Sequence, residues 1–131
     1  MTNRTAIIAS NGSLFDAYKV FNIATAAAAS EHETAIFFTF EGLNFIHKQA
    51  SAQLPMPEGK EHFAEGFAKA NVPGIPELIA MAQELDVKFI ACQMTMDVMG
   101  LTEEDMVDGI QVGGAAAFLE FAKDADVTLA F

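Results

Sequence analysis

Cysteine is almost missing from this sequence, which contains Cys92 alone, and tryptophan is missing altogether. A single cysteine excludes an intramolecular disulfide and zinc sites built from several cysteines, and it is typical of a reducing compartment. Long apolar runs are missing too, because stretches such as Ala26–Ala29 fall far short of the roughly 20 residues that span a bilayer. The chain begins with only a short apolar stretch, Ala6–Ala9, and lacks the h-region of a signal peptide. We therefore expect a cytoplasmic protein without a transmembrane helix.

Basic residues are scarce. Seven lysine and arginine residues, of which Arg4 is the one arginine, stand against 18 acidic residues and leave a formal net charge of −11. Such an acidic surface repels nucleic acids and anionic membranes, so neither is expected as a partner. Backbone N–H groups at helix N-termini can still bind phosphate without lysine or arginine, so charge alone does not exclude a nucleotide.

Apolar residues are abundant: they make up 52% of the 131 residues and include 12 phenylalanines. This composition and length predict one domain, residues 1–131, with a substantial core. Strand-like runs alternate with helical patterns, which predicts an α/β fold with a parallel sheet and right-handed crossovers. The expected strands are Thr5–Ser10, Thr34–Phe40, Val87–Ala91, Ile110–Val112 and Asp126–Phe131, and the main expected helices are Leu14–Ser30, Leu43–Ala50, Pro76–Leu85 and Ala115–Asp124.

Helical spacing also predicts which side chains pack against the sheet. The expected apolar positions are Leu14, Tyr18, Phe21, Thr25 and Ala28 in the first helix and Phe118, Leu119 and Ala122 in the last. Prolines and glycines interrupt the pattern over residues 51–74, which predicts a long excursion from the sheet.

Open parallel sheets bind ligands beyond the carboxyl ends of their strands. Three loops are expected to meet at that edge, namely residues 11–13, 41–44 and 92–99. The binding candidates in these loops are Asn11, Gly12, Gly42, Asn44, Met94, Thr95 and Met96.

Cys92 directly follows the third expected strand and is the candidate catalytic residue. If Gln93–Met99 is helical, the sulfur lies near a helix N-terminus, where the dipole favours a nucleophilic thiolate. The methionines around it support the opposite interpretation, because a sulfur buried among apolar side chains has a raised pKa and is inert. Position alone leaves both interpretations open.

Other polar features have structural explanations. His47 is the histidine best placed to approach the carboxyl edge, but the histidines lack the spacing of metal ligands, so no metal site is expected. Consecutive acids at 103–105 fit a helix start, where they cap the helix and complement its dipole. Gly113-Gly114 lacks the spacing of a dinucleotide-binding loop and indicates a tight turn.

Several segments, in this order along the chain, match a known pattern. They are Ser10-Asn11-Gly12-Ser13 with Asp16, Phe37 to Asn44, Ala91 to Leu101 with its Cys-x-Met-x-Met-Asp-Val-Met-Gly run, and Gly113-Gly114-Ala115 with Phe118-Leu119. Through them the sequence resembles the DsrE/DsrF-like family, and within it the branch often labelled "peroxiredoxin family". Two features depart from that branch: Thr95 stands where serine is frequent, and the segment 51–74 looks shorter than the corresponding segment of that branch.

The resemblance implies a flavodoxin-like three-layer sandwich with a mostly parallel five-stranded sheet, in a family that assembles into homo- or hetero-oligomers. For this chain we expect a homo-oligomer. It implies a sulfur carrier or sulfurtransferase that holds sulfur as a persulfide on Cys92, without a cofactor. The partners implied are TusA-like sulfur carriers and rhodanese-type donors. Peroxidase chemistry fits less well, because it needs an activating arginine and Arg4 begins the first strand, at the opposite edge of the sheet.

Two alternatives remain from the residues themselves. The fold alone is compatible with a nucleotide- or flavin-binding module in which Cys92 is incidental. The chain is also compatible with a structural oligomer subunit whose cysteine is buried and inert.

Overall fold

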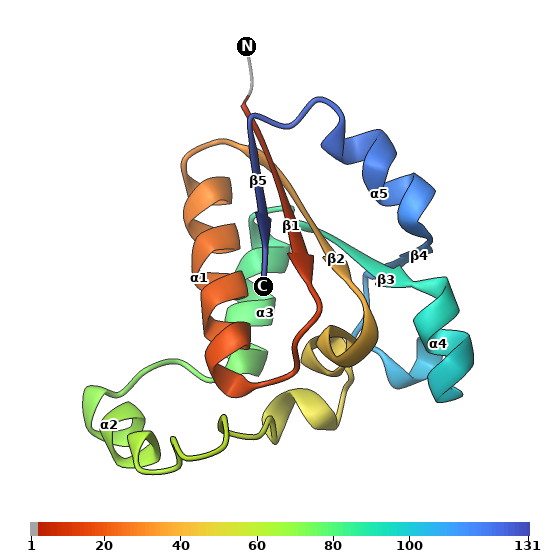
Figure 1. Ribbon diagram of the computed structural model, residues 1–131. Coiled ribbons are helices and arrows are strands. Elements are labelled where there is room, and N and C mark those ends of the chain that lie inside the picture. Colours follow the sequence, from red (N-terminus) through yellow and green to blue (C-terminus); the bar gives the residue numbers. More distant parts are fainter. Residues whose placement is uncertain (1–2) are drawn as a thin grey trace.

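The computed structural model describes residues 3–131, and within them the chain forms one five-stranded sheet (Figure 1). The strand order is β4-β3-β2-β1-β5, and every neighbouring pair is parallel. The predicted α/β fold with a parallel sheet is therefore confirmed. The strands are β1 (Arg4–Ala9), β2 (Glu33–Phe38), β3 (Lys88–Cys92), β4 (Gln111–Gly113) and β5 (Val127–Ala130).

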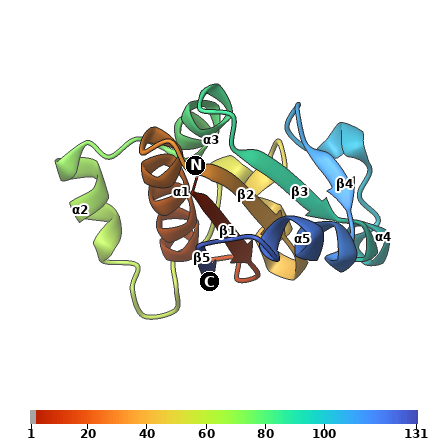
Figure 2. The same cartoon turned by 90° about the horizontal axis from the view of Figure 1, so that it is seen from above.

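Helices cover both faces of the sheet and make a flavodoxin-like three-layer sandwich (Figure 2). The chain moves across the sheet in one direction from β1 to β4, so right-handed crossovers put α1 (Leu14–Ala29) and α3 (Ile75–Glu84) on the same face. The connection from β4 to β5 runs back across the sheet, which places α5 (Ala115–Ala122) on the opposite face.

The main core lies between the sheet and the α1/α3 layer. Phe21 of α1 packs within 6.0 Å, between ring centroids, of both Phe38 and Phe89 on the sheet. The buried stripe of α1 differs from the predicted one, because Tyr18 and Thr25 are only half-buried. Small side chains bring the helix close to the sheet. The buried residues of α1 are Ala17, Val20, Phe21 and Ala24.

A smaller core lies on the α5 face, where Phe118 stacks on Phe37 with ring centroids 5.3 Å apart. Among residues 3–131, the eight-residue α5 is the one helix that contributes to this core. Leu119, predicted on the packed side of the helix, is 62% exposed, and Phe121 is buried in its place. This face is therefore less completely covered than the α1/α3 face.

The predicted second strand ends two residues early, at Phe38. Phe40 begins a 3₁₀ turn, η1 (Phe40–Ile46), which occupies much of the expected helix 43–50, and a second short turn, η2 (Ala50–Ala52), follows. Phe40 has a left-handed backbone (φ 50°) and is 56% exposed, so the expectation of a buried strand residue was wrong here.

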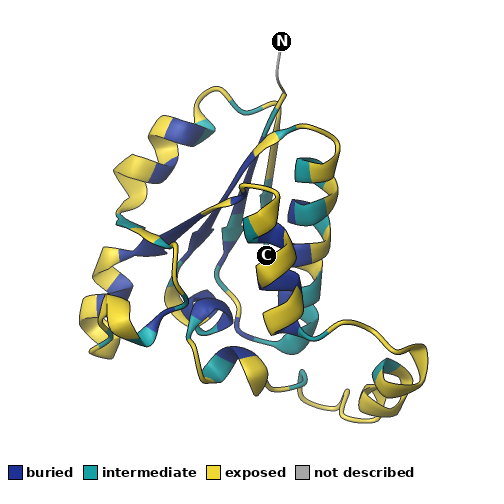
Figure 3. Ribbon diagram, turned by 180° about the vertical axis from the view of Figure 1, so that it is seen from behind, coloured by how far each residue is buried: buried dark blue, intermediate teal, exposed yellow. Residues whose placement is uncertain are grey.

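The excursion over residues 51–74 contains one helix, α2 (Phe63–Ala70), which extends from the body of the molecule (Figure 1). It contacts α1 through aromatic pairs, with Phe63 5.3 Å from Phe15 and Phe67 4.9 Å from Tyr18 between ring centroids. Every residue of α2 is exposed or half-buried (Figure 3). Across residues 3–131, none of the helices has the length and apolar character required to cross a membrane.

Candidate functional site

Cys92 is the last residue of β3 and the N-cap of α4 (Gln93–Met99). It pairs in register with Gly113 of β4. The chain leaves β3 toward the α1/α3 face, where Met96 packs in the core, but it leaves β4 toward α5 on the other face. Neighbouring connections thus diverge beside Cys92, and open parallel sheets bind their ligands at such a switch point.

The side chain of Cys92 is 5% exposed and belongs to the core on the α5 face, with Phe37, Ile90 and Phe118. Two threonines flank it. Thr95 lies in the first turn of α4 and is 1% exposed, and Thr39 directly follows β2. Their hydroxyl oxygens are 3.3 Å apart, so the segments that follow β2 and β3 each bring a hydroxyl group to this edge of the sheet.

Hydrogen bonds lower the pKa of the Cys92 thiol below its ordinary value, despite its burial. Burial is the largest single influence and raises the pKa, but it is outweighed by hydrogen bonds from the hydroxyl and N–H of Thr95, the Thr39 hydroxyl and the Met94 N–H. Both N–H groups belong to the first turn of α4, where N–H groups lack intrahelical partners. The thiolate is the nucleophilic form of cysteine, so this environment favours reactivity.

The glycines among the binding candidates have packing roles. A Cβ atom at Gly42 would lie 2.0 Å from the carbonyl oxygen of Ala9, and one at Gly12 would lie 3.0 Å from Cβ of Glu41. The loops after β1 and β2 are therefore in close contact, joined also by a 3.0 Å hydrogen bond from the Thr39 N–H to the Ala9 carbonyl.

The remaining candidates lie at different depths. Asn11 is exposed, and its N–H donates to the Phe131 carbonyl at 3.4 Å. Asn44 lies within η1, where its carbonyl accepts from the His47 N–H. Met96 is buried in the main core at 3% exposure, whereas Met94 is 55% exposed.

Met94 thus joins other exposed apolar side chains on α4 and on the neighbouring turn η1. We call this set the apolar rim. It consists of Phe40, Met94, Val98 and Met99.

The histidine that sequence reasoning placed nearest the site is engaged elsewhere. The Nδ1 atom of His47 accepts hydrogen bonds from the N–H groups of Gln49 and Ala50, both at 3.1 Å. His32 likewise lies 2.8 Å, through Nδ1, from the Thr5 hydroxyl. Throughout residues 3–131, no three His, Cys, Asp or Glu side chains gather as they would around a metal ion.

Sequence reasoning missed Thr39 and Phe40, which it assigned to the strand. A polar residue directly after a buried strand is the signal that could have indicated Thr39, because polar side chains at the carboxyl ends of parallel strands face the ligand edge. No comparable signal marks Phe40, whose peptide N–H donates to the Thr95 hydroxyl at 3.1 Å.

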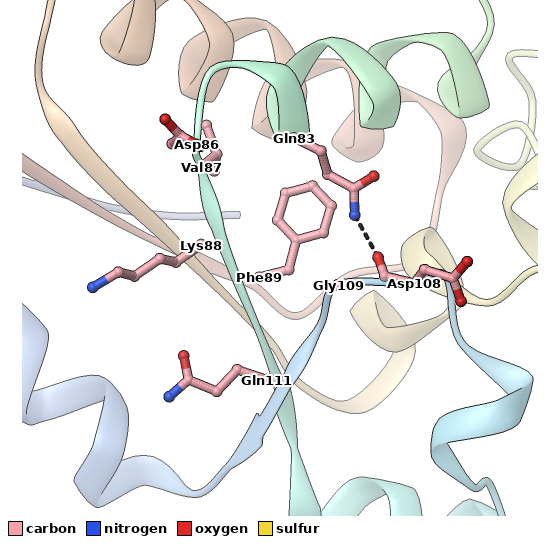
Figure 4. A pocket seen from close by; sticks show the side chains of 8 residues that line it. All are labelled: Gln83, Asp86, Val87, Lys88, Phe89, Asp108, Gly109 and Gln111. Carbon is pink, nitrogen blue, oxygen red and sulfur yellow. Dashed lines mark hydrogen bonds between the residues drawn. The ribbon is translucent and has the colours of Figure 1, made fainter.

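A cavity of about 600 Å³ lies at the other end of β3 (Figure 4). Lys88, the first residue of β3, lines it, and the Gln83 side chain donates to the Asp108 carbonyl across it at 2.6 Å. The cavity exists because β4 pairs only with residues 90–92, which leaves the start of β3 uncovered at this edge. It is separate from Cys92, which ends the same strand.

The fold and the site define a flavodoxin-like α/β protein with a free, buried cysteine at the carboxyl end of its strand β3. The chain belongs to the DsrE/DsrF/DrsH-like family, which it matches over residues 1–67 and 56–130, so the resemblance found in the sequence is confirmed. The two matched segments overlap in the region of α2, within the excursion that looked shortened.

Two curated relatives align along almost their whole length. The sulfur carrier protein DsrE2 of Allochromatium vinosum is 36% identical over 153 residues, covering 96% of each chain. The uncharacterized protein YrkE of Bacillus subtilis is 36% identical over 154 residues, covering 98% of this chain and 96% of YrkE. Both alignments are longer than this chain, so each relative carries residues with no counterpart here. The family therefore includes a sulfur carrier.

Solved structures share the fold at low sequence identity. A protein of unknown function from Methanobacterium thermoautotrophicum has a TM-score of 0.64 at 12% identity, and the ychN protein from E. coli has a TM-score of 0.61 at 18% identity. Each comparison covers 98% of this chain and 99% of the other.

Proposed function

We propose that this protein is a sulfur carrier that holds sulfur as a persulfide on Cys92 and exchanges it with protein partners. The observation that carries the proposal is a buried cysteine at the carboxyl edge of the sheet, whose pKa is lowered by the Thr95 and Thr39 hydroxyls and by the first N–H groups of α4. The 36% identity to a named sulfur carrier, over nearly the full length of both chains, supports the same chemistry.

The reaction is an exchange between thiols and persulfides. The Cys92 thiolate attacks the outer sulfur of a donor persulfide, a new S–S bond forms at Cys92, and the donor leaves as a thiolate. In the second half, an acceptor thiolate attacks the outer sulfur on Cys92, and the electron pair of the broken S–S bond returns to Cys92. Each half moves one sulfur atom without net oxidation and without a second cysteine in this chain.

The partners that fit this chemistry are a persulfide donor of the rhodanese type and a thiol acceptor of the TusA type. The apolar rim offers soft, adaptable side chains for such partners, and methionine suits this use because it is flexible. With a formal net charge of −11, the protein favours a basic partner, whose approach it would accelerate. Exchange with reduced thiols is also the reason for placing the protein in the cytoplasm.

Self-association is a further part of the proposal. The α5 face is less completely covered, and Leu119 exposes 62% of its surface there. Exposed apolar side chains beside an incompletely covered sheet face are typical of oligomer interfaces.

The test is intact-mass spectrometry of wild type and Cys92→Ser after exposure to a persulfide donor, with alkylation to trap the adducts. Whole-sulfur mass increments are expected on wild type alone. Sulfur that still binds to Cys92→Ser, or a wild type that reacts with alkylating agents but never gains sulfur, contradicts the proposal.

A structural subunit with an inert cysteine is the second candidate, and the 5% exposure of Cys92 favours it. Alkylation separates the two candidates. The structural role predicts labelling of Cys92 only in denaturant, whereas the sulfur carrier predicts labelling of the native protein.

A further inference from the structure

The hydroxyl of Thr95 can form only a few combinations of hydrogen bonds with the groups around it. A threonine hydroxyl offers one proton and two acceptor positions. Its oxygen accepts a hydrogen bond from the Phe40 N–H at 3.1 Å and lies 3.3 Å from the Thr39 hydroxyl. Because a backbone N–H can only donate, one acceptor position of Thr95 is fixed, and its proton must point elsewhere. At 1% exposure, water is not available as its partner.

Two acceptors are open to that proton: the Thr39 oxygen at 3.3 Å, and the sulfur of Cys92, the N-cap three residues earlier, whose pKa the Thr95 hydroxyl lowers. A thiolate has no proton to donate, so it requires donors around it. If Thr95 donates to the sulfur, Thr39 can donate to the Thr95 oxygen or to the sulfur, and every donor has an acceptor. In the reverse arrangement, with Thr95 donating to Thr39, the one hydroxyl left for the sulfur is that of Thr39, which is only half-buried.

The backbone of Phe40 explains why its N–H reaches Thr95. Phe40 adopts φ 50°, a left-handed conformation that is unfavourable for a bulky residue, and its side chain gains little burial in return. The turn is fixed on both sides, since the Thr39 N–H bonds to the Ala9 carbonyl at 3.0 Å and the Gly42 N–H bonds to the Thr39 carbonyl at 3.0 Å. Such strained residues cluster at functional sites, where the surrounding structure holds them in place.

We propose that the strained Phe40 peptide is a positioning group, whose N–H occupies one acceptor site of Thr95 and thereby directs the Thr95 proton to the Cys92 sulfur. The Thr95 hydroxyl then stabilises negative charge on that sulfur. The use of this arrangement in sulfur exchange rests on the function proposed above, whereas the arrangement itself does not.

The same hydrogen bond has a role in unloading. When an acceptor thiolate attacks the outer sulfur, the S–S bond to Cys92 breaks and its electron pair goes to the Cys92 sulfur. A better stabilised thiolate is a faster leaving group. Thr95 therefore favours release of sulfur to an acceptor as well as the initial attack on a donor.

The test is the pH dependence of iodoacetamide alkylation of the native protein, compared among wild type, Thr95→Val and Thr95→Ser. Valine keeps the branched shape and removes the hydroxyl, whereas serine keeps the hydroxyl. We expect Thr95→Val to raise the midpoint by about one pH unit, roughly a tenfold loss of rate at neutral pH, as for a lost hydrogen bond to a charged group. Thr95→Ser is expected to retain the wild-type midpoint.

Thr39→Val is the matched control, because it removes the neighbouring hydroxyl. It should raise the midpoint less than Thr95→Val does. A larger shift in Thr39→Val, an unchanged Thr95→Val, or a Thr95→Ser that behaves like Thr95→Val overturns the inference. Circular dichroism checks folding, and Thr95→Ala, with the same expectation, replaces Thr95→Val if valine prevents folding.

Sulfur loading of the same proteins separates this inference from the proposed function. A wild type that takes up no sulfur while Thr95→Val shifts the alkylation midpoint refutes the carrier function and leaves the positioning role intact. A wild type that loads sulfur while Thr95→Val leaves the midpoint unchanged refutes the positioning role alone.

Discussion

The close approach at Gly42 gives a quantitative prediction about what holds the site together. An alanine there would place its Cβ 2.0 Å from the carbonyl oxygen and 2.5 Å from the carbonyl carbon of Ala9. Both atoms belong to the backbone of β1, so no side chain can rotate away and the loop after β2 must move. Forcing an extra carbon into a packed interior costs about 3 kcal/mol in free energy of unfolding when the backbone has to shift.

Urea unfolding followed by circular dichroism measures this cost. With an m value of about 2 kcal/mol per M, Gly42→Ala is expected to lower the unfolding midpoint by about 1.5 M. The displaced loop carries Thr39 and Phe40, so the alkylation rate of Cys92 at neutral pH should fall in the same variant.

Gly66→Ala is the matched control, because a Cβ atom at Gly66 meets nothing within 4 Å and the residue lies inside α2. Alanine in a helix interior is favoured over glycine by about 0.5–1 kcal/mol, so Gly66→Ala should unfold at slightly higher urea. The reasoning is refuted if Gly42→Ala is as stable as wild type, or if both variants lose stability equally.

Two further predictions concern the thiol and the α5 face. The lowered pKa of Cys92 in the folded state contributes stability that is complete above the pKa of the unfolded thiol, about 8.5, and is lost as pH falls through the folded value. The difference in unfolding free energy between wild type and Cys92→Ser should therefore increase as pH rises toward about 8.5, and a difference that is constant with pH contradicts the assignment. Leu119→Lys should reduce the particle mass measured by light scattering with little change in stability, because Leu119 is 62% exposed. The control Gln49→Lys, at an exposed position between η1 and η2, should change neither the mass nor the stability. Equal masses for the two variants would exclude α5 from the interface.

The sequence was sufficient for most of the architecture because the central strands are short, mostly apolar and buried on both faces. β2 and β3 are of this kind, and the placement of Cys92 at the carboxyl end of β3 followed from their periodicity. The register in which the strands pair is harder to predict from the sequence. That Thr39 and Thr95, 56 residues apart, end side by side depends on how the two strands pair, and local patterns do not specify pairing.

The errors have the same origin. Phe40 reads as the end of an apolar strand, but the approach of Gly42 to Ala9 turns the chain there, and that contact involves a distant segment. Leu119 was predicted to be buried because helical spacing identifies the apolar side of a helix but not how the helix is oriented on the sheet. In the orientation that α5 adopts, Phe121 is buried and Leu119 is exposed. In α1, Tyr18 stacks on Phe67 of α2, a partner that the interrupted segment 51–74 did not reveal.

The 5% exposure of Cys92 also determines how long a loaded sulfur would stay in place. A persulfide exposed on a surface loses its outer sulfur to whichever free thiol collides with it, and small thiols are abundant in a reducing cell. With the Phe37 and Phe118 rings packed around the attachment point, attack requires an approach along a narrow and defined direction. A partner that binds the apolar rim can present its own thiol along that direction, and would react faster than a freely diffusing thiol, which must find the same direction by chance. Burial of the sulfur would thus act as a kinetic filter that retains the cargo until the correct acceptor docks.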